Sequence, residues 1–179
     1  MKILLVIDVQ NDFIDGALAN EAAQNAMPRI REKVNQCRDE GYKIIFTRDT
    51  HGNNYLDTLE GKYLPYPHCI KYTHGWKIAE KLVKENDLII DKPNFGYVHM
   101  LEHIYRSMET YELEDIEEIE LIGFCTDICV ISTALILKAE LGKTIVSCDA
   151  TCCAGTSEEA HKAALMVMKC CQVEVRGDY

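Results

Sequence analysis

The sequence predicts an α/β fold with a doubly wound, mainly parallel sheet and helices on both of its faces. Short apolar runs rich in Ile and Val recur at wide spacing, and helical patterns separate most of them. Unbroken apolar runs are typical of strands buried on both faces, and strands that alternate with helices favour parallel pairing. The predicted strands are residues 3–7, 43–47, 88–90, 119–122, 144–147 and 173–175.

Three helices are predicted between or after these strands. Residues 22–40 and 128–141 are each followed by a glycine, Gly41 and Gly142, where a left-handed C-terminal cap is favoured. The last helix is predicted to open at Thr156, with Glu159 completing a capping box, and to run to about residue 170. Residues 48–75 have no sustained period, and a loop of that length inside a compact domain is usually functional.

Composition narrows the class of protein. A chain of 179 residues with 47% hydrophobic residues predicts one domain, residues 1–179. A formal net charge of −10, with acidic residues interspersed among hydrophobic ones, argues against a nucleic-acid surface and favours small neutral or cationic ligands. The first apolar run stops at Asp8 without a cleavage-site pattern, so we expect no signal peptide, no membrane partner and a cytoplasmic location.

Two further features of the sequence argue against common types of site. The nine cysteines are odd in number and form no Cys-x-x-Cys pair, which argues for reduced thiols and against a zinc ribbon. The first strand is not followed by a glycine-rich phosphate loop, so nucleotide binding is not favoured.

Reactive side chains follow four successive predicted strands. Because ligands collect at the carboxyl ends of parallel strands, we expect these side chains to meet at one edge of the sheet. Singly, each has an ordinary interpretation as a turn carboxylate, a solvated lysine or a buried thiol. Together they suggest a cysteine nucleophile, since a helix N-terminus and a cation lower a thiol pKa and a carboxylate can accept the proton. The residues are Asp8; Asp49 and His51; Lys92; and Cys125, Thr126, Asp127 and Cys129.

Three segments carry a family resemblance. They are Asp-Val-Gln-Asn-Asp-Phe at residues 8–13, Lys92 with Phe95 three residues on, and Gly-Phe-Cys-Thr-Asp-Ile-Cys-Val at residues 123–130. In this order they resemble the motif blocks of the nicotinamidase/isochorismatase-like cysteine hydrolase superfamily, and in particular its nicotinamidases (pyrazinamidases). The resemblance implies an isochorismatase-like six-stranded sheet and a catalytic triad of Asp8, Lys92 and Cys129. It also implies a cis peptide between Phe124 and Cys125, with an oxyanion hole formed by the backbone N–H groups of Cys125 and Cys129.

The long loop contains a second resemblance, to the metal-binding loop of nicotinamidases. Asp49-Thr-His51 and the later His68 would be ligands, with Glu60, preferred by its spacing, or Asp57 as a fourth. Imidazole and carboxylate donors suit a divalent ion, with zinc preferred and iron or manganese as alternatives. The ordinary alternative is that the loop histidines are surface residues. The other histidines are expected to be structural or solvated: His74, His99, His103 and His161.

The activity implied by the resemblance is cysteine-dependent hydrolysis of nicotinamide to nicotinate and ammonia through a thioester. The partners expected are a small-molecule amide and further copies of the chain in a homo-oligomer. Phe13, Phe95 and Tyr97 are the expected substrate-binding walls. Two departures weaken the substrate assignment: residues 92–98 read Lys-Pro-Asn-Phe-Gly-Tyr-Val where Lys-x-x-Tyr-Ser-Ala-Phe is usual, and Cys125 replaces a usual Ala.

Three alternatives remain open at this point. Amidases for carbamoyl or ureido compounds generally lack the Asp-x-His pair, and vinyl-ether hydrolases of the superfamily generally lack the cysteine. A non-catalytic binding protein on the same fold is the third alternative. Such a protein is expected to have lost a member of the triad, and Asp8, Lys92 and Cys129 are all present.

Overall fold

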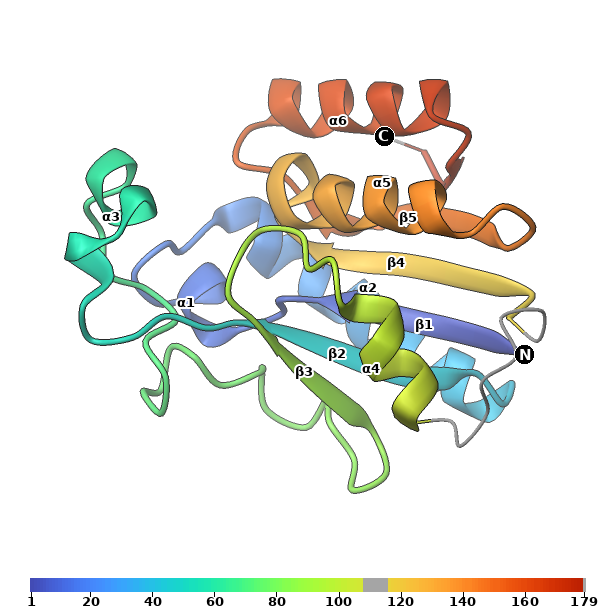
Figure 1. The fold of residues 1–179 in the computed structure, drawn as a ribbon, viewed down its shortest axis with the longest axis horizontal. Helices are drawn as coiled ribbons and strands as arrows, with labels where there is room; N and C mark the ends of the chain where they lie inside the picture. Colours follow the sequence, from blue (N-terminus) through green and yellow to red (C-terminus); the bar gives the residue numbers. More distant parts are fainter. Residues whose placement is uncertain (108–115, 179) are drawn as a thin grey trace.

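Six parallel strands form one sheet in the computed structural model, which describes residues 1–107 and 116–178 (Figure 1). Their order is β3-β2-β1-β4-β5-β6, and every neighbouring pair is parallel. The direction of winding reverses between β1 and β4, so a crevice is expected at their carboxyl ends. The strands are β1 (Lys2–Ile7), β2 (Lys43–Asp49), β3 (Leu88–Lys92), β4 (Glu118–Phe124), β5 (Ile145–Ala154) and β6 (Glu174–Arg176).

Helices cover both faces, as predicted. In Figure 1, α2 (Glu21–Asp39) lies behind the sheet, and α4 (Met100–Ser107) and α5 (Ile131–Glu140) lie in front of it. The last helix, α6 (Glu158–Cys170), packs on the same side as α5. Four short helical segments lie beyond the carboxyl ends of the strands: α1 (Asn11–Ile14), η1 (Tyr55–Asp57), α3 (Leu59–Tyr63) and the π-helical turn η3 (Thr126–Val130).

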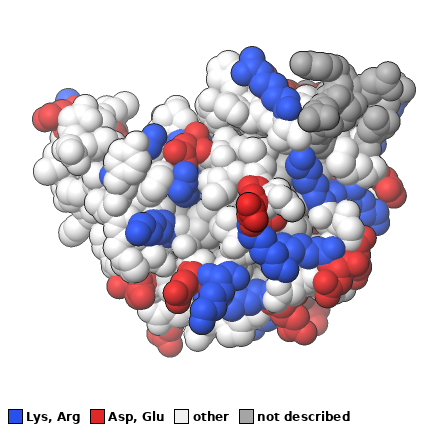
Figure 2. Space-filling view, turned by 90° about the horizontal axis from the view of Figure 1, so that it is seen from below, with Lys and Arg blue, Asp and Glu red and all other residues white. Residues whose placement is uncertain are grey.

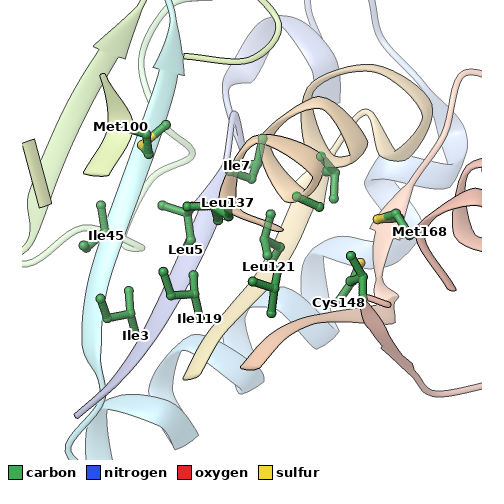
Figure 3. Packing of buried hydrophobic residues seen from close by; sticks show 14 of the residues in the cluster. Ile3, Leu5, Ile7, Ile45, Met100, Ile119, Leu121, Leu137, Cys148 and Met168 are labelled. Atoms are coloured by element: carbon green, nitrogen blue, oxygen red, sulfur yellow. The ribbon is translucent and has the colours of Figure 1, made fainter. Parts of the chain in front are cut away.

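Alternate residues of β1 belong to two separate cores. Ile3, Leu5 and Ile7 pack under α4, α5 and α6, and Figure 3 shows them in a row beside Ile45 and Ile119. Leu4 and Val6 pack on the opposite face, against apolar residues of α2. Burial of both faces explains why the strand is an unbroken apolar run and not an alternating one.

The boundaries of several elements differ from the predictions. Gly41 has the expected left-handed φ of +81°, but Gly142 does not, because the chain leaves α5 in an extended conformation at the buried Leu141. Helix α6 is capped by the Ser157 side chain, which accepts from Ala160 N–H, and not by Thr156. The loop at residues 48–75 is not structureless, since β2 extends into it and η1 and α3 lie within it.

Gly123 of β4 leaves no room for a side chain beside β1. Its φ is +119°, and a Cβ atom there would lie only 2.0 Å from the carbonyl oxygen of Ile7. Only glycine fits so close to another backbone in this conformation. The main chains of β1 and β4 are therefore in direct contact just before the segments that follow them.

The molecular surface mixes charges of both signs. On the face seen from below, Lys and Arg side chains lie directly beside Asp and Glu (Figure 2). Across the two described ranges, every helix is too short or too polar to cross a membrane.

Candidate functional site

Asp8 lies at the crevice, immediately after β1. Its φ is +47°, a left-handed conformation that Asp tolerates better than most side chains. The carboxylate is fully buried, and its Oδ1 atom accepts a hydrogen bond of 2.6 Å from the Thr47 hydroxyl. The Asp8 backbone N–H donates to the same hydroxyl oxygen at 3.1 Å. Thr47 on β2 therefore fixes both the main chain and the side chain of Asp8.

Lys92, the last residue of β3, connects Asp8 to Cys129. Its Nζ atom lies 2.7 Å from Asp8 Oδ2 and 3.5 Å from Cys129 Sγ, and it donates to the Asn94 carbonyl at 3.1 Å. Cys129 comes from the π-helical turn η3 after β4. The three residues predicted to form a triad thus meet at one buried point, although they come from three different strand ends.

The turn that carries Cys129 is entered through a cis peptide between Phe124 and Cys125, at the position implied by the resemblance. The Cys125 carbonyl accepts from the N–H groups of Ile128 and Val130, both at 3.1 Å. Asp127 accepts from the N–H and the hydroxyl of Thr156, at 2.8 Å and 2.5 Å. These bonds fix the turn to itself and to the segment that leads into α6.

Burial dominates the electrostatics of this group. It raises the pKa of the Cys129 thiol well above its usual value; the Asp8 carboxylate raises it further, and Lys92 acts in the opposite direction. The expectation of a lowered thiol pKa is therefore wrong, because desolvation outweighs the lysine. Burial also raises the pKa of Asp8, against the effect of Lys92. A thiol of this kind needs a base beside it to become a thiolate, and Asp8 is a carboxylate made more basic by burial.

A second cluster of polar side chains lies next to Lys92. Asp49, His51, Glu60 and His68, which we call the donor cluster, each offer one ligand atom, and these four atoms lie within 4.8 Å of one another. Nε2 of His51 is 3.0 Å from Asp49 Oδ2 and 3.5 Å from Glu60 Oε1. Nε2 of His68 is 3.5 Å and 3.6 Å from the same two atoms. Of the two candidates for the fourth position, Glu60 joins the group and Asp57 is exposed.

The chemistry of the donor cluster fits a divalent metal ion. Two imidazole nitrogens and two carboxylate oxygens suit a borderline ion such as zinc. The Nδ1 atom of His68 lies 2.9 Å from the Tyr66 carbonyl, so a proton held there leaves Nε2 free as a ligand. Burial alone raises the pKa of Asp49, but the contacts with His51 and His68 and the charge of Lys92 together outweigh burial and lower it, so Asp49 is ionised.

One cavity joins the two groups. It has a volume of about 580 Å³, and both Cys129 and three members of the donor cluster line it. This volume is in the usual range of small-molecule sites. The remaining wall is mostly apolar, with a few polar groups: Phe13, Leu18, Ala19, Asn20, Leu64, Phe95, Cys125, Ile128 and Thr156.

Two of the three residues expected to contact substrate line this cavity. Phe13 and Phe95 line the cavity, but Tyr97 does not. The Tyr97 ring packs beside His99 and His103, with ring centroids 5.6 Å apart in each case, and against the core under α4. The long loop contributes Leu64 to the cavity wall, while its tyrosines are either buried behind the histidines or exposed: Tyr55, Tyr63, Tyr66 and Tyr72.

Sequence reasoning missed several residues that shape the site. Tyr55 is buried, and its ring packs edge-on against those of His51 and His68, with centroids 4.8 Å and 5.1 Å away. The sequence predicts Thr47 only as a residue of a strand and not as a partner of Asp8. His161, expected to be structural or solvated, is half-buried and lies 2.8 Å from the Thr126 hydroxyl; His74, His99 and His103 are exposed.

Comparison with known proteins places nearly the whole chain in one family. Residues 2–177 match the family model of the Isochorismatase domain. The chain is 26% identical to a nicotinamidase/pyrazinamidase of Mycobacterium tuberculosis, over 98% of both chains. It is 25% identical to a nicotinamidase of Saccharomyces cerevisiae, over 84% of this chain and 88% of that one. A crystal structure of a nicotinamidase from Bacillus subtilis superposes with a TM-score of 0.82 at 26% identity, covering 98% of this chain and 99% of the other.

Proposed function

Because the chain belongs to the isochorismatase family, we propose that it is a nicotinamidase, which hydrolyses nicotinamide to nicotinate and ammonia. The coarser statement, that it is an amide-hydrolysing enzyme, is supported by relatives that are named as nicotinamidases and that this chain matches over most of their length. The observation that carries the finer proposal is the shared cavity. A thiol and a set of metal-type donors face the same space of about 580 Å³, which suits a small planar amide.

In the proposed reaction, Cys129 is the nucleophile and Asp8 is the base. Asp8 takes the proton from the Cys129 thiol, and the thiolate attacks the amide carbonyl carbon. Backbone N–H groups of Cys125 and Cys129 stabilise the resulting oxyanion. The C–N bond then breaks, ammonia leaves with the proton returned by Asp8, and a thioester to Cys129 remains.

The second half of the reaction uses the same base. Asp8 removes a proton from water, which attacks the thioester carbonyl; the C–S bond breaks to release the carboxylic acid, and Asp8 returns the proton to the Cys129 sulfur. Lys92 keeps its positive charge throughout, because Asp8 and Cys129 raise its pKa against the effect of burial. Its ammonium group, 2.7 Å from Asp8 and 3.5 Å from the sulfur, stabilises negative charge on whichever of the two carries it.

The donor cluster is the reason for proposing nicotinamide as the substrate. Asp49, His51, Glu60 and His68 would hold a divalent ion, which when bound supplies a coordination position for a ring nitrogen. Phe13 and Phe95 provide apolar walls for a flat ring between the donor cluster and Cys129. An aromatic amide with a ring nitrogen meets both ends of the cavity, whereas an aliphatic amide meets only the thiol.

A panel of amides tests the proposal by release of ammonia. Nicotinamide should be hydrolysed far faster than benzamide, which keeps the ring and lacks only its nitrogen, and faster than aliphatic amides. Cys129→Ala protein, purified in the same way, controls for contaminating amidases. Equal turnover of benzamide and nicotinamide, or ready cleavage of a ureido compound with neither amide attacked, would refute the nicotinamidase proposal and leave the coarser one standing.

A further inference from the structure

The Gln10 side chain binds the main chain of the donor residue Asp49 on both of its polar groups. Gln10 has no exposed surface. Its Nε2 atom donates to the Asp49 carbonyl at 2.9 Å, and its Oε1 atom accepts from the Asp49 N–H at 2.7 Å. A second bond from Nε2, of 2.8 Å, reaches the Trp76 carbonyl. The amide therefore fixes the end of β2 at the point where Asp49 enters the donor cluster.

Asp12, two residues further on, binds the other arm of the same loop. Its Oδ2 atom accepts from the N–H of Cys69, the neighbour of His68, at 2.7 Å. The Cys69 carbonyl in turn accepts from the His51 N–H at 3.0 Å. Gly75 allows this arrangement, since a Cβ atom there would lie 2.1 Å from the Asp12 carboxylate. Asp12 thus holds the main chain of Cys69, which follows one histidine donor in the sequence and accepts from the backbone of the other.

We infer that Gln10 and Asp12 are positioning residues for the candidate metal site, acting through the backbones of Asp49 and Cys69. The inference deepens the proposed function and depends on its donor cluster binding a divalent ion. Neither side chain belongs to the cluster, and both lie in the segment that begins with Asp8. This segment therefore carries the proposed base and also holds the two arms of the loop at the spacing that four donors require.

The physical argument is one of preorganisation. Asp49 and His51 lie at the start of the long loop, whereas Glu60 and His68 lie further along it. A metal ion binds tightly only where its ligands are already held close together. Partners that orient metal ligands typically contribute 10-fold to 100-fold in affinity. Residues that only held the loop to the sheet would affect folding but would leave the zinc affinity of the folded protein unchanged.

The test measures zinc affinity in paired variants by competition with a chromogenic chelator. Gln10→Met keeps the length of the side chain and removes all of its hydrogen bonds. Gln24→Met is its control, because Gln24 lies on an exposed face of α2 and its amide donates to the Ile14 carbonyl. Asp12→Asn removes one carboxylate, and Asp15→Asn removes a neighbouring exposed one as a control for charge. Circular dichroism identifies a temperature at which each variant is folded, and the rise in Tm on adding zinc gives a second readout of binding.

Gln10→Met and Asp12→Asn should each raise the Kd for zinc by about 10-fold to 100-fold, and each control variant should keep a Kd near the wild-type value. A folded Gln10→Met or Asp12→Asn protein with wild-type zinc affinity overturns the inference for that residue. If one variant does not fold, the other still decides the question for its own arm of the loop. Wild-type protein that binds no zinc, iron or manganese overturns the inference together with the metal part of the proposed function. Metal binding without nicotinamide hydrolysis refutes the substrate and leaves the inference intact.

Discussion

Lys92 and Asp8 form an ion pair of 2.7 Å in which neither side chain has any surface exposed to solvent. A second carboxylate, Asp49, lies 3.6 Å from the same ammonium group. One buried cation therefore lies between a proposed base and a proposed metal ligand, and removing it takes away the ammonium group paired with Asp8.

Lys92→Met should lower the free energy of unfolding by about 3–5 kcal/mol, because breaking a buried pair leaves an unpaired charge in the interior. Urea denaturation measures the change. The double variant Asp8→Asn with Lys92→Met should be more stable than Lys92→Met alone, since the charge left behind is removed. A Lys92→Met protein no less stable than one with the exposed change Lys162→Met would show that the pair is not buried in solution.

Single replacement of a triad residue should remove nearly all amide hydrolysis. Cys129→Ala takes away the proposed nucleophile and Asp8→Asn the proposed base, so each should lower kcat to a small residual value. The double variant should lose little more, because the two residues act in the same step. Cys171→Ala, at an exposed thiol, is the matched control. Normal turnover by Cys129→Ala would direct attention to Cys125, the other thiol that lines the cavity.

The donor cluster should be separable from the fold. Protein purified without chelator should contain about one zinc, iron or manganese ion per chain, and His51→Ala should abolish it, since the cluster loses a nitrogen ligand. Elemental analysis measures the ion, and circular dichroism should find the metal-free protein still folded. The exposed His74→Ala serves as the control. Full occupancy in His51→Ala would mean that the ion is held elsewhere.

The two aromatic residues after β3 should differ in their effect on substrate binding. Phe95 lines the cavity, so Phe95→Ala should raise KM for nicotinamide several-fold. Tyr97→Phe removes only a hydroxyl that lies 3.3 Å from His103 Nε2, outside the cavity, and should leave KM unchanged. Steady-state kinetics on both variants decides the point; a larger rise in KM for Tyr97→Phe would place that residue back at the substrate.

Acid should destabilise the protein partly through Glu118. Burial alone raises the pKa of Glu118, but hydrogen bonds from Ser147 and Arg176, with the charges of Arg176 and Lys2, together outweigh burial and lower its pKa below the usual 4.5. A carboxyl group of this kind stabilises the fold at pH values above its unfolded pKa, and the contribution is lost as pH falls through the lower folded pKa. Urea midpoints measured below pH 4.5 should therefore fall less steeply for Glu118→Gln than for the wild type. If the urea midpoints of the two proteins fell equally steeply with pH, the lowered pKa of Glu118 would be wrong.

Local patterns in the sequence were enough to predict the sheet and the meeting of Asp8, Lys92 and Cys129, because parallel strands bring their carboxyl ends to one edge whatever lies between them. They could not predict the α6 cap. Thr156 has the right residue type, but its hydroxyl is bound by Asp127, which is 29 positions away in the chain. A contact at that separation leaves no local signal.

The direction in which a side chain points and the extent of its burial could not be predicted from the sequence either. Tyr97 and Phe95 are both aromatic and two positions apart, yet only packing in the folded chain decides which of them faces the cavity. The direction of the Cys129 pKa shift likewise depends on how completely the thiol is desolvated, and a motif does not record that.

The close contact between Gly123 and Ile7 has a consequence for how such a site can diversify. Ile7 immediately precedes Asp8, and Gly123 opens the segment that leads to Cys129. The distance between the Asp8 and Cys129 side chains is therefore set where one polypeptide backbone touches another. Side chains around the cavity can then be exchanged during evolution, and new ligands accommodated, while the spacing of the reacting pair stays constant. The scaffold would keep its chemical step as its specificity drifts.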